Sequence, residues 1–241
     1  MSGFPVNPDE IIQKVLNTAN QIFNNTQKTA SETIAFKRMI STVYYGADLL
    51  IDLIEPYWKH NKAYQVIEIC LYLHLYARIL DDAVDEALPL HRLNLLKIQP
   101  LFWNTVTQIS LSFPDKSNAV SVLIKETIQA VIEEWHKYRI ETWGTKNHHL
   151  LTAPLLLSGS MSEFEQYKPY LSDFIFLLQA KEEILQNRLE NAEQKIELLK
   201  NLEKLVSEDW IYDLHGAGWK TLAHRIPLEL DFILLNLRRN L

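Results

Sequence analysis

Residues 64–80 form an almost uninterrupted apolar stretch that ends in a cluster of carboxylates. Apolar residues would occupy most sides of the helix formed by this stretch, which is typical of a helix in the centre of a fold rather than on its surface. The cluster reads Asp81-Asp82-Ala83-Val84-Asp85-Glu86. A buried helix that ends in carboxylates needs positive charge beside them, because an unpaired charge is costly to bury.

The spacing of these carboxylates favours a metal ion as the positive partner. Asp81 and Asp85 lie four residues apart and project from one side of a helix, whereas Asp82 is offset by about 100°. Like charges at this spacing repel each other, and carboxylates are disfavoured at the negative end of a helix dipole. Mg²⁺ binds one or two carboxylates together with waters and substrate phosphate oxygens. The sequence therefore indicates a magnesium site, and a solvated helix end is the alternative.

The rest of the chain predicts a single all-α domain. Its 241 residues include only 6 glycines, and many Leu, Ile, Glu and Lys favour helices over turn-rich sheets. We expect a flexible arm over residues 1–8 and one helical domain over residues 9–241, with no linker long enough to divide it. The apolar spacing predicts helices over residues 9–27, 31–54, 62–87, 93–111, 118–142, 163–205 and 222–241, and a loop over residues 213–220.

Composition narrows the classes of function. The formal net charge of −6 disfavours nucleic acid as a partner. The single cysteine, Cys70, excludes an internal disulfide and fits a reducing compartment. The first residues lack the features of a secretory signal, and no window is long and apolar enough to span a membrane. We expect a cytoplasmic protein that a hydrophobic substrate could bring into peripheral contact with a membrane, and the sequence is compatible with a homodimer.

The segment YARILDDAVDE, residues 76–86, resembles the first aspartate-rich motif of the class I isoprenoid synthase superfamily. It is most similar to the squalene and phytoene synthase-like branch, in which an aromatic residue, Ala and Arg precede DDxxDE. Trans-prenyl diphosphate synthases and terpene cyclases share the DDxxD core. The resemblance implies an all-α bundle around a central apolar cavity, a Mg²⁺ cofactor and a prenyl diphosphate substrate. It also implies that Asp81, Asp82 and Asp85 hold the metal and act in catalysis.

The family has a second acidic motif on a facing helix, and residues 174–190 are the candidate for it. In one alignment Gln179, Glu182 and Glu183 correspond to the FQxxDDxxD pattern of prenyl diphosphate synthases. In another, Gln186 and Glu190 take the acidic positions of the squalene synthase-like pattern. We expect Glu183 and Glu190 to be metal ligands on a shared helix face. A charged, solvated helix face is the alternative.

Basic residues near these motifs are the candidates for contacts with the diphosphate. Arg78 lies one turn before the paired aspartates, and Arg188 lies in the second motif. The segment AFKRM, residues 35–39, resembles the GKR stretch of prenyl diphosphate synthases, which places Lys37 and Arg38 at the substrate. Tyr76 completes the expected substrate-binding residues. The chain lacks the arginine pair that follows DDxxD in those synthases, so chain elongation is the least favoured reaction.

Three hypotheses follow from the sequence. In the first, the chain is an enzyme that ionises a prenyl diphosphate in order to cyclise it, eliminate from it or couple it. In the second, it is a catalytically degenerate member that binds a prenyl lipid or a protein partner, as the Glu and Gln residues of the second motif would suggest. In the third, it is an unrelated helical bundle. The first two require the acidic stretches to face each other.

Overall fold

The buried helix that the sequence predicts is α3 (Ala63–Val84), and it contacts α1, α2, α4 and α7. It has buried side chains on all of its sides, because the consecutive residues Ile69, Cys70 and Leu71 point about 100° apart and are all inaccessible to solvent. This computed structural model describes residues 7–23, 30–84, 91–136, 140, 143, 151–186, 189, 192–205 and 208–239.

Every element in the described part of the chain is a helix, as the composition predicts, and the described residues include no strand. The elements besides α3 are α1 (Pro8–Phe23), α2 (Ala30–Leu53), η1 (Glu55–Tyr57), α4 (His91–Ser112), η2 (Pro114–Lys116), α5 (Ser117–His136), α7 (Ala153–Ser158), α8 (Met161–Leu185), α9 (Ala192–Leu205), α10 (Glu208–Gly216) and α11 (Lys220–Arg239).

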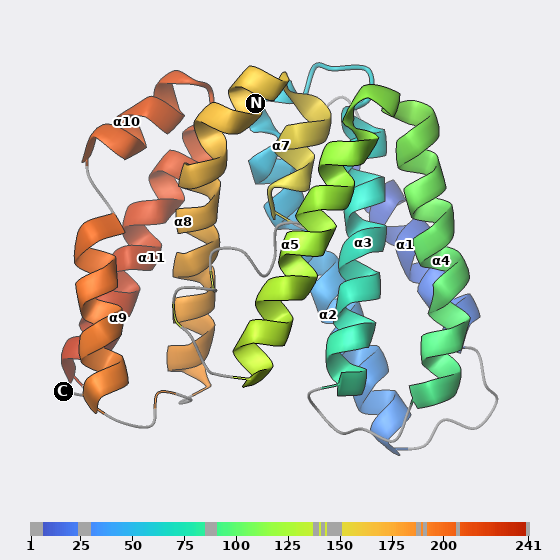
Figure 1. Ribbon diagram of the computed structural model, residues 1–241, viewed down its shortest axis with the longest axis horizontal. Coiled ribbons are helices and arrows are strands. Elements are labelled where there is room, and N and C mark those ends of the chain that lie inside the picture. The colour runs from blue at the N-terminus through green and yellow to red at the C-terminus, as the bar shows by residue number, and fades with distance from the viewer. Residues whose placement is uncertain are drawn as a thin grey trace.

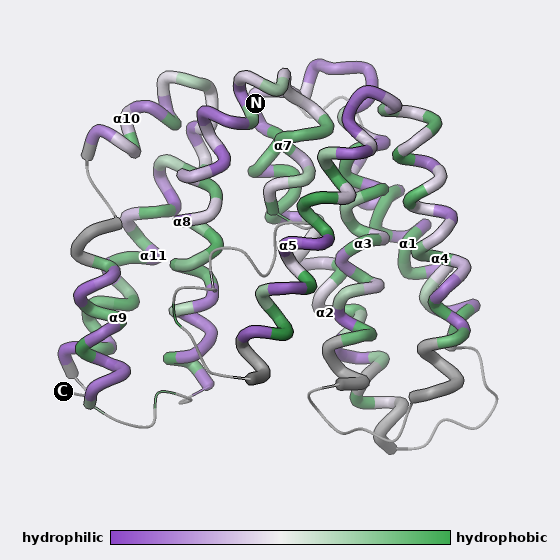
Figure 2. Tube along the Cα trace, in the orientation of Figure 1, coloured by the Kyte–Doolittle hydropathy of each residue, from purple (hydrophilic) through white to green (hydrophobic). Residues whose placement is uncertain are grey.

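The helices form two groups that stand side by side (Figure 1). One group contains α1 to α5, and the other contains α8 to α11. The short helix α7 lies between them and contacts α2, α3, α5 and α8. Five of its six residues are buried, and Figure 2 shows it as mainly hydrophobic, whereas α9 carries many hydrophilic residues. The C-terminal ends of α3, α5 and α8 all lie at the lower end of the bundle in Figure 1.

Polar contacts join the two groups at the upper end of α2. The indole Nε1 of Trp219 donates a hydrogen bond to the carbonyl oxygen of Leu53 over 2.7 Å, and the backbone N–H of Thr221 donates to Glu55 Oε2 over 2.8 Å. Both donors lie at the start of α11, and both acceptors lie at the end of α2 or in η1. The start of α11 is thereby fixed against the end of α2.

Two local motifs set the ends of helices in the second group. α8 begins with a capping box, in which Ser160 and Glu163 bond each other's backbone N–H. α10 ends in a Schellman motif: Gly218 has a φ of 106°, and the N–H of Trp219 donates to the carbonyl of Leu214 over 3.0 Å. Such a positive φ favours glycine, so Gly218 fixes the turn into α11.

The structure corrects two of the predicted elements. The helix predicted over residues 163–205 is wrong, because α8 ends at Leu185, Gln186 caps it, and α9 begins only at Ala192. The loop predicted over residues 213–220 is also wrong, because α10 continues through Gly216 and α11 starts at Lys220. The predicted start and end of the helix over 31–54 are confirmed to within one residue, and α4 continues through Pro100.

No described helix is both long and apolar enough to cross a membrane. The chain therefore matches the sequence prediction on this point, within the residues that the structure describes.

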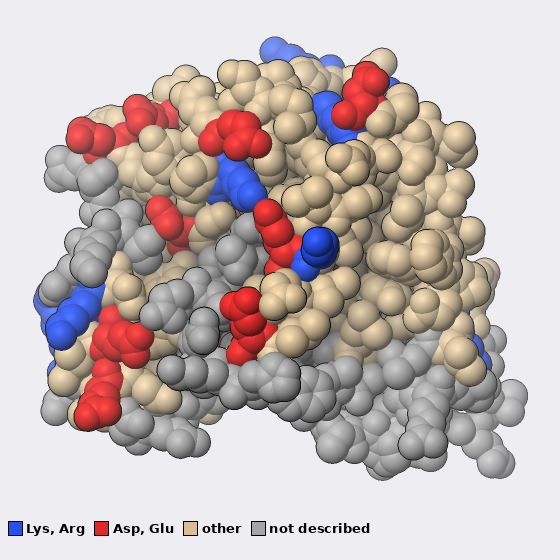
Figure 3. Space-filling model, in the orientation of Figure 1, with Lys and Arg blue, Asp and Glu red and all other residues tan. Residues whose placement is uncertain are grey.

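Charged side chains are unevenly spread over the face in Figure 3: they gather over the middle and left of the molecule, whereas the upper right, over α4, is almost uncharged.

Candidate functional site

Asp81 and Asp82 lie in the last turn of α3, at the C-terminal end of the buried helix. The structure describes their backbone but not their side chains, and Asp85 and Glu86 lie outside the described residues. The negative end of the α3 dipole adds to the negative potential of carboxylates placed here. The local chemistry is therefore an acidic helix end that favours a cation.

The side of α3 that leads to these aspartates packs closely against α2. A Cβ built on Gly46 of α2 would stand 2.8 Å from Cδ2 of His74 of α3, so the two helices touch at these residues. Arg78, which is half-buried, follows His74 by one turn, and Asp82 follows Arg78 by another. The small residue at position 46 thus allows α2 to run directly beside the helix that carries the acidic motif.

This contact fixes which residues of α2 lie level with the acidic motif. The two helices are joined by a short connection and run in opposite directions (Figure 1). If Gly46 lies opposite His74, eight residues back along α2 is Arg38 and eight residues on along α3 is Asp82. Arg38 and its neighbour Lys37 are both exposed. The pairing places the two expected diphosphate-binding residues of α2 at the level of the acidic cluster.

Tyr76, the fifth expected substrate-binding residue, packs on the other side of α3. Its ring stacks on that of Phe102 of α4, with 4.5 Å between centroids and 26° between planes. Such an offset stack contributes to packing beyond the area that it buries. Arg188 lies outside the described residues.

The second acidic motif lies on α8, where two neighbouring glutamates have opposite surroundings. Glu183 is buried with 3% of its surface exposed, and Gln179 Nε2 donates a hydrogen bond to its Oε1 over 2.6 Å. Glu182 is exposed and accepts a hydrogen bond from Gln186 Nε2 over 2.8 Å. For Glu183, the alternative of a solvated helix face is therefore excluded.

The end of α8 limits the second motif. Because α8 ends at Leu185, Glu183 lies in its last turn, and the helix does not extend as far as position 190. Glu190 itself lies outside the described residues. The described members of the second motif are thus Gln179, Glu182, Glu183 and Gln186, of which Gln179 and Glu183 are buried.

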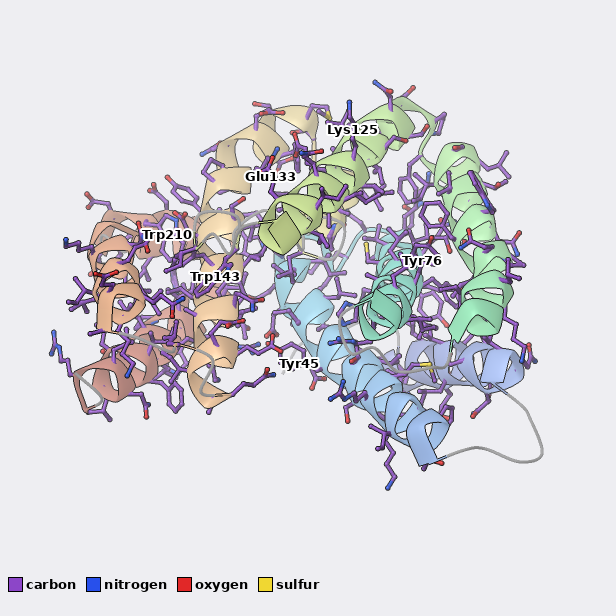
Figure 4. All side chains as sticks on the ribbon, turned by 60° about the horizontal axis from the view of Figure 1, so that its bottom comes forward. Tyr45, Tyr76, Lys125, Glu133, Trp143 and Trp210 are labelled. Carbon is purple, nitrogen blue, oxygen red and sulfur yellow. The ribbon has the colours of Figure 1, made fainter. Side chains whose placement is uncertain are left out.

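The buried side of α8 that carries Glu183 continues upward as a row of polar and aromatic residues. Phe176 lies one turn before Gln179 and contacts the fully buried Trp143, with 5.5 Å between ring centroids. Figure 4 shows Trp143 beside α8. Asp173 lies a further turn back, and burial raises its pKa to about 6. This row gives the interior side of α8 both titratable and apolar character.

An ion-pair network that no sequence motif marks connects α2, α8 and α11. Arg225 Nη1 lies 3.2 Å from Asp52 Oδ2, and Arg225 Nε lies 3.4 Å from Glu229 Oε1. Lys181 Nζ lies 2.6 Å from the other oxygen of Glu229. Only the pair of Arg225 and Glu229, four residues apart, could have been found from the sequence. The network holds α8 and α11 at a fixed position against α2.

Tyr45 of α2, labelled in Figure 4, lies close to this network, because the charges of Arg225 and Glu229 both act on its phenol. Partial burial raises the pKa of its phenol, the negative charges of Glu229 and Glu182 raise it further, and the positive charge of Arg225 opposes them. The phenol therefore stays protonated at neutral pH and is available as a hydrogen-bond donor. Tyr45 is half-exposed, so a ligand could reach it.

The described side chains include no group of three His, Cys, Asp or Glu residues close enough together to hold a metal ion. The side chains of Asp81 and Asp82 are not described, so this finding does not cover them. No protein-family model, curated protein or solved structure matches this chain. The case for a function therefore depends on the chain's own residues.

Proposed function

We propose that this protein is a Mg²⁺-dependent enzyme similar to the class I isoprenoid synthases, and that it ionises a prenyl diphosphate. The observation that supports this most strongly is the position of the two acidic motifs. Asp81 and Asp82 end α3, Glu183 lies near the end of α8, and both of these helix ends lie at the lower end of the bundle in Figure 1. Carboxylates at one end of the bundle are what a shared cation site requires.

The burial of Glu183 is the second support. A buried carboxylate is costly unless hydrogen bonds or a positive charge stabilise it, and Gln179 contributes one such hydrogen bond. Oxygen ligands of this kind suit Mg²⁺, which binds few carboxylates and retains sites for phosphate oxygens. In this proposal, the metal ligands are Asp81, Asp82, Asp85, Glu183 and Glu190.

The remaining expected residues would bind the substrate. Arg78 lies one turn before the aspartates, and Arg38 and Lys37 lie level with them on α2, so their charges would attract the diphosphate. Arg188 of the second motif is a further candidate, and Tyr76 would act through its packing against Phe102. The prenyl chain would occupy a central apolar cavity between the two helix groups.

The reaction is the heterolytic cleavage of an allylic C–O bond. Pyrophosphate leaves with the electron pair, and the carbon chain keeps the positive charge. Cyclisation or coupling moves this charge to another carbon, and the loss of a proton then removes it. Bound Mg²⁺ would supply charge that stabilises the leaving pyrophosphate. The chain's own part is to hold the diphosphate with its basic side chains and to shield the cation from water with apolar and aromatic surfaces.

The test is pyrophosphate release from geranyl, farnesyl and geranylgeranyl diphosphates, with Mg²⁺ and with EDTA. We expect release from at least one substrate with Mg²⁺, none with EDTA, and none from Asp82→Ala. Asp209→Ala, which changes an exposed aspartate on α10, is the matched control and should keep full activity. A folded wild-type protein that releases no pyrophosphate would instead favour a non-catalytic binder of prenyl lipids.

A further inference from the structure

A concave site lies at the opposite end of α3 from the acidic motif. It is a half-open pocket of about 560 Å³ between the start of α3, the end of α4, η2 and the end of α7. Pockets of this size hold small molecules. Ala63 and Asp82 are 19 residues apart on one helix, which separates the pocket from the acidic end by about 28 Å. The pocket is therefore distinct from the site proposed above.

Two lysines on the wall of this pocket are held in place by backbone carbonyls. Lys116 Nζ donates to the carbonyl oxygens of Leu157 and Gly159 over 3.1 Å and 2.5 Å. Lys62 Nζ donates to the carbonyl oxygen of Ser112 over 2.7 Å. A lysine ammonium has three donors, so both lysines keep donors beyond these bonds among the described residues. The carbonyl bonds reduce the freedom of two side chains that are normally mobile, which lowers the entropic cost of binding a ligand.

In the empty pocket, the positive charges of Lys62 and Lys116 repel each other. Burial lowers the pKa of Lys116, and the positive charge of Lys62 also lowers it, whereas the negative charges of Glu163 and Asp115 oppose this shift. The N-terminal end of α3 also borders the pocket and adds positive potential. Of the acidic residues nearby, Asp115 lines the pocket and is exposed, as Lys62 is, so water screens both of these charges, and Glu163 is engaged by Ser160 and Tyr57. An anion between the lysines would relieve their repulsion.

Ser158 supplies an independent sign of a missing partner. It lines the same pocket, and its hydroxyl oxygen is fully buried without a hydrogen-bond partner among the described residues. Buried hydroxyls almost always have a partner in native proteins, and each exception asks for an explanation such as a ligand. A hydroxyl and two ammonium groups on different walls together match the several oxygens of a tetrahedral oxyanion.

We propose that this pocket binds a small phosphate-containing anion, such as inorganic phosphate or pyrophosphate, through Lys62, Lys116 and Ser158. The site does not require a metal ion, and it does not depend on the enzymatic function proposed above. The ligand's oxygens would take the remaining lysine donors, and a rotation about χ1 would turn the buried Ser158 hydroxyl toward them. Phe113, whose ring centroid lies 4.8 Å from Lys62 Nζ, closes one side of the pocket.

The test is isothermal titration of the full chain with phosphate and with pyrophosphate in EDTA. Chelation keeps the metal-dependent site at Asp82 from contributing. We expect saturable binding at one site, weakened at least fivefold in Lys62→Met and lost in the Lys62→Met, Lys116→Met double variant. Lys125→Met is the matched control, because Lys125 is exposed on α5 and does not line the pocket (Figure 4). The affinity of this variant for the anion should stay within twofold of that of the wild type.

Two additional variants keep the test decisive if the loss of Lys116 unfolds the chain. Lys116→Arg keeps the charge and the donors and should retain most of the binding, whereas Ser158→Ala removes only a hydroxyl and should weaken binding severalfold without changing the thermal midpoint. The proposal is overturned if the wild type shows no saturable binding at millimolar ligand. It is equally overturned if folded Lys62→Met and Ser158→Ala both bind as tightly as the wild type.

Discussion

Gly46 of α2 lies against the imidazole of His74 of α3 so closely that a Cβ at position 46 would stand 2.8 Å from Cδ2 of His74. Contacts this short require a neighbour to move, because protein interiors are packed without spare room. The contact sets both the separation and the relative level of the two helices. It therefore determines where Arg38 lies along the end of α3 that carries Asp82.

Gly46→Ala is expected to destabilise the fold despite the better helix propensity of alanine. Overpacking against His74 should cost about 1–3 kcal/mol, and the propensity gain of about 1 kcal/mol offsets part of that cost. Gly216→Ala is the control, because no atom lies within 4 Å of the added Cβ there and the residue has no positive φ. Urea unfolding should show a lower midpoint for Gly46→Ala and an unchanged or higher one for Gly216→Ala. Equal midpoints would contradict the close contact.

Glu183→Gln and Glu182→Gln separate a buried carboxylate from an exposed one on the same turn of α8. Glutamine keeps the shape of Glu183 and can still accept the hydrogen bond from Gln179. Under the proposed function, Glu183→Gln should lower kcat/KM for pyrophosphate release at least tenfold, and Glu182→Gln should change it less than threefold. Thermal stability without Mg²⁺ should be unchanged or higher in Glu183→Gln, because a buried charge is removed. Equal activities in the two variants would exclude Glu183 as a metal ligand.

The sequence predicts most of the helices, because regular apolar spacing is a strong signal over twenty residues. It does not predict the break after Leu185. The residues that follow include no Gly or Pro, and Asn187 and Asn191 are only weak helix breakers in a run rich in Glu and Lys. The error over residues 213–220 has the opposite origin: Gly216 and Gly218 both suggest a loop, yet only Gly218 leaves the helix.

The candidate site is predictable only where its residues are close in the sequence. The acidic motif at the end of α3 is local, so the pattern of Asp81 and Asp82 after an apolar stretch is sufficient to find it. The burial of Glu183 beside the exposed Glu182 cannot be predicted from the sequence, because it depends on how α8 packs. The bond between Arg225 and Asp52 joins residues 173 positions apart, and no local pattern indicates such a contact.

The stability of the fold should respond to pH through Asp173. Burial raises the pKa of its carboxyl from 3.8 to about 6, so the folded chain binds a proton there more tightly than the unfolded chain does. Stability contributed by this proton is present below about pH 4 and is lost as the pH rises through 6. Asp173→Asn should therefore be more stable than the wild type at pH 7, and the difference should vanish near pH 4. Urea midpoints between pH 4 and 8 measure it.

Asp231→Asn is the control for this pH effect, because Asp231 is exposed on α11. Its midpoint should follow that of the wild type at every pH. A wild-type profile that is flat between pH 4 and 7, or one that Asp173→Asn leaves unchanged, would show that Asp173 has an ordinary pKa in the folded chain.

The sequence is compatible with a homodimer, and the outer side of α4 is the surface on which we propose that one forms. Leu96, Trp103 and Leu111 are each more than 60% exposed there, and residues 98–112 include no charged side chain. Figure 3 shows the same uncharged area at the upper right. A surface without charge suits a second copy of itself, because like charges would face each other across a two-fold axis. Helices that lie on membranes instead carry Lys or Arg along their polar face.

Trp103→Glu should therefore convert the protein from dimer to monomer. Light scattering should give twice the chain mass of 28.1 kDa for the wild type and the chain mass for the variant. Tyr212→Glu, which changes a residue of similar exposure on α10, should leave the dimer intact. A wild-type monomer that floats with lipid vesicles, and loses this binding in Trp103→Glu, would assign the same surface to a membrane instead. Equal masses for the wild type and Trp103→Glu, without vesicle binding, would exclude α4 as an interface.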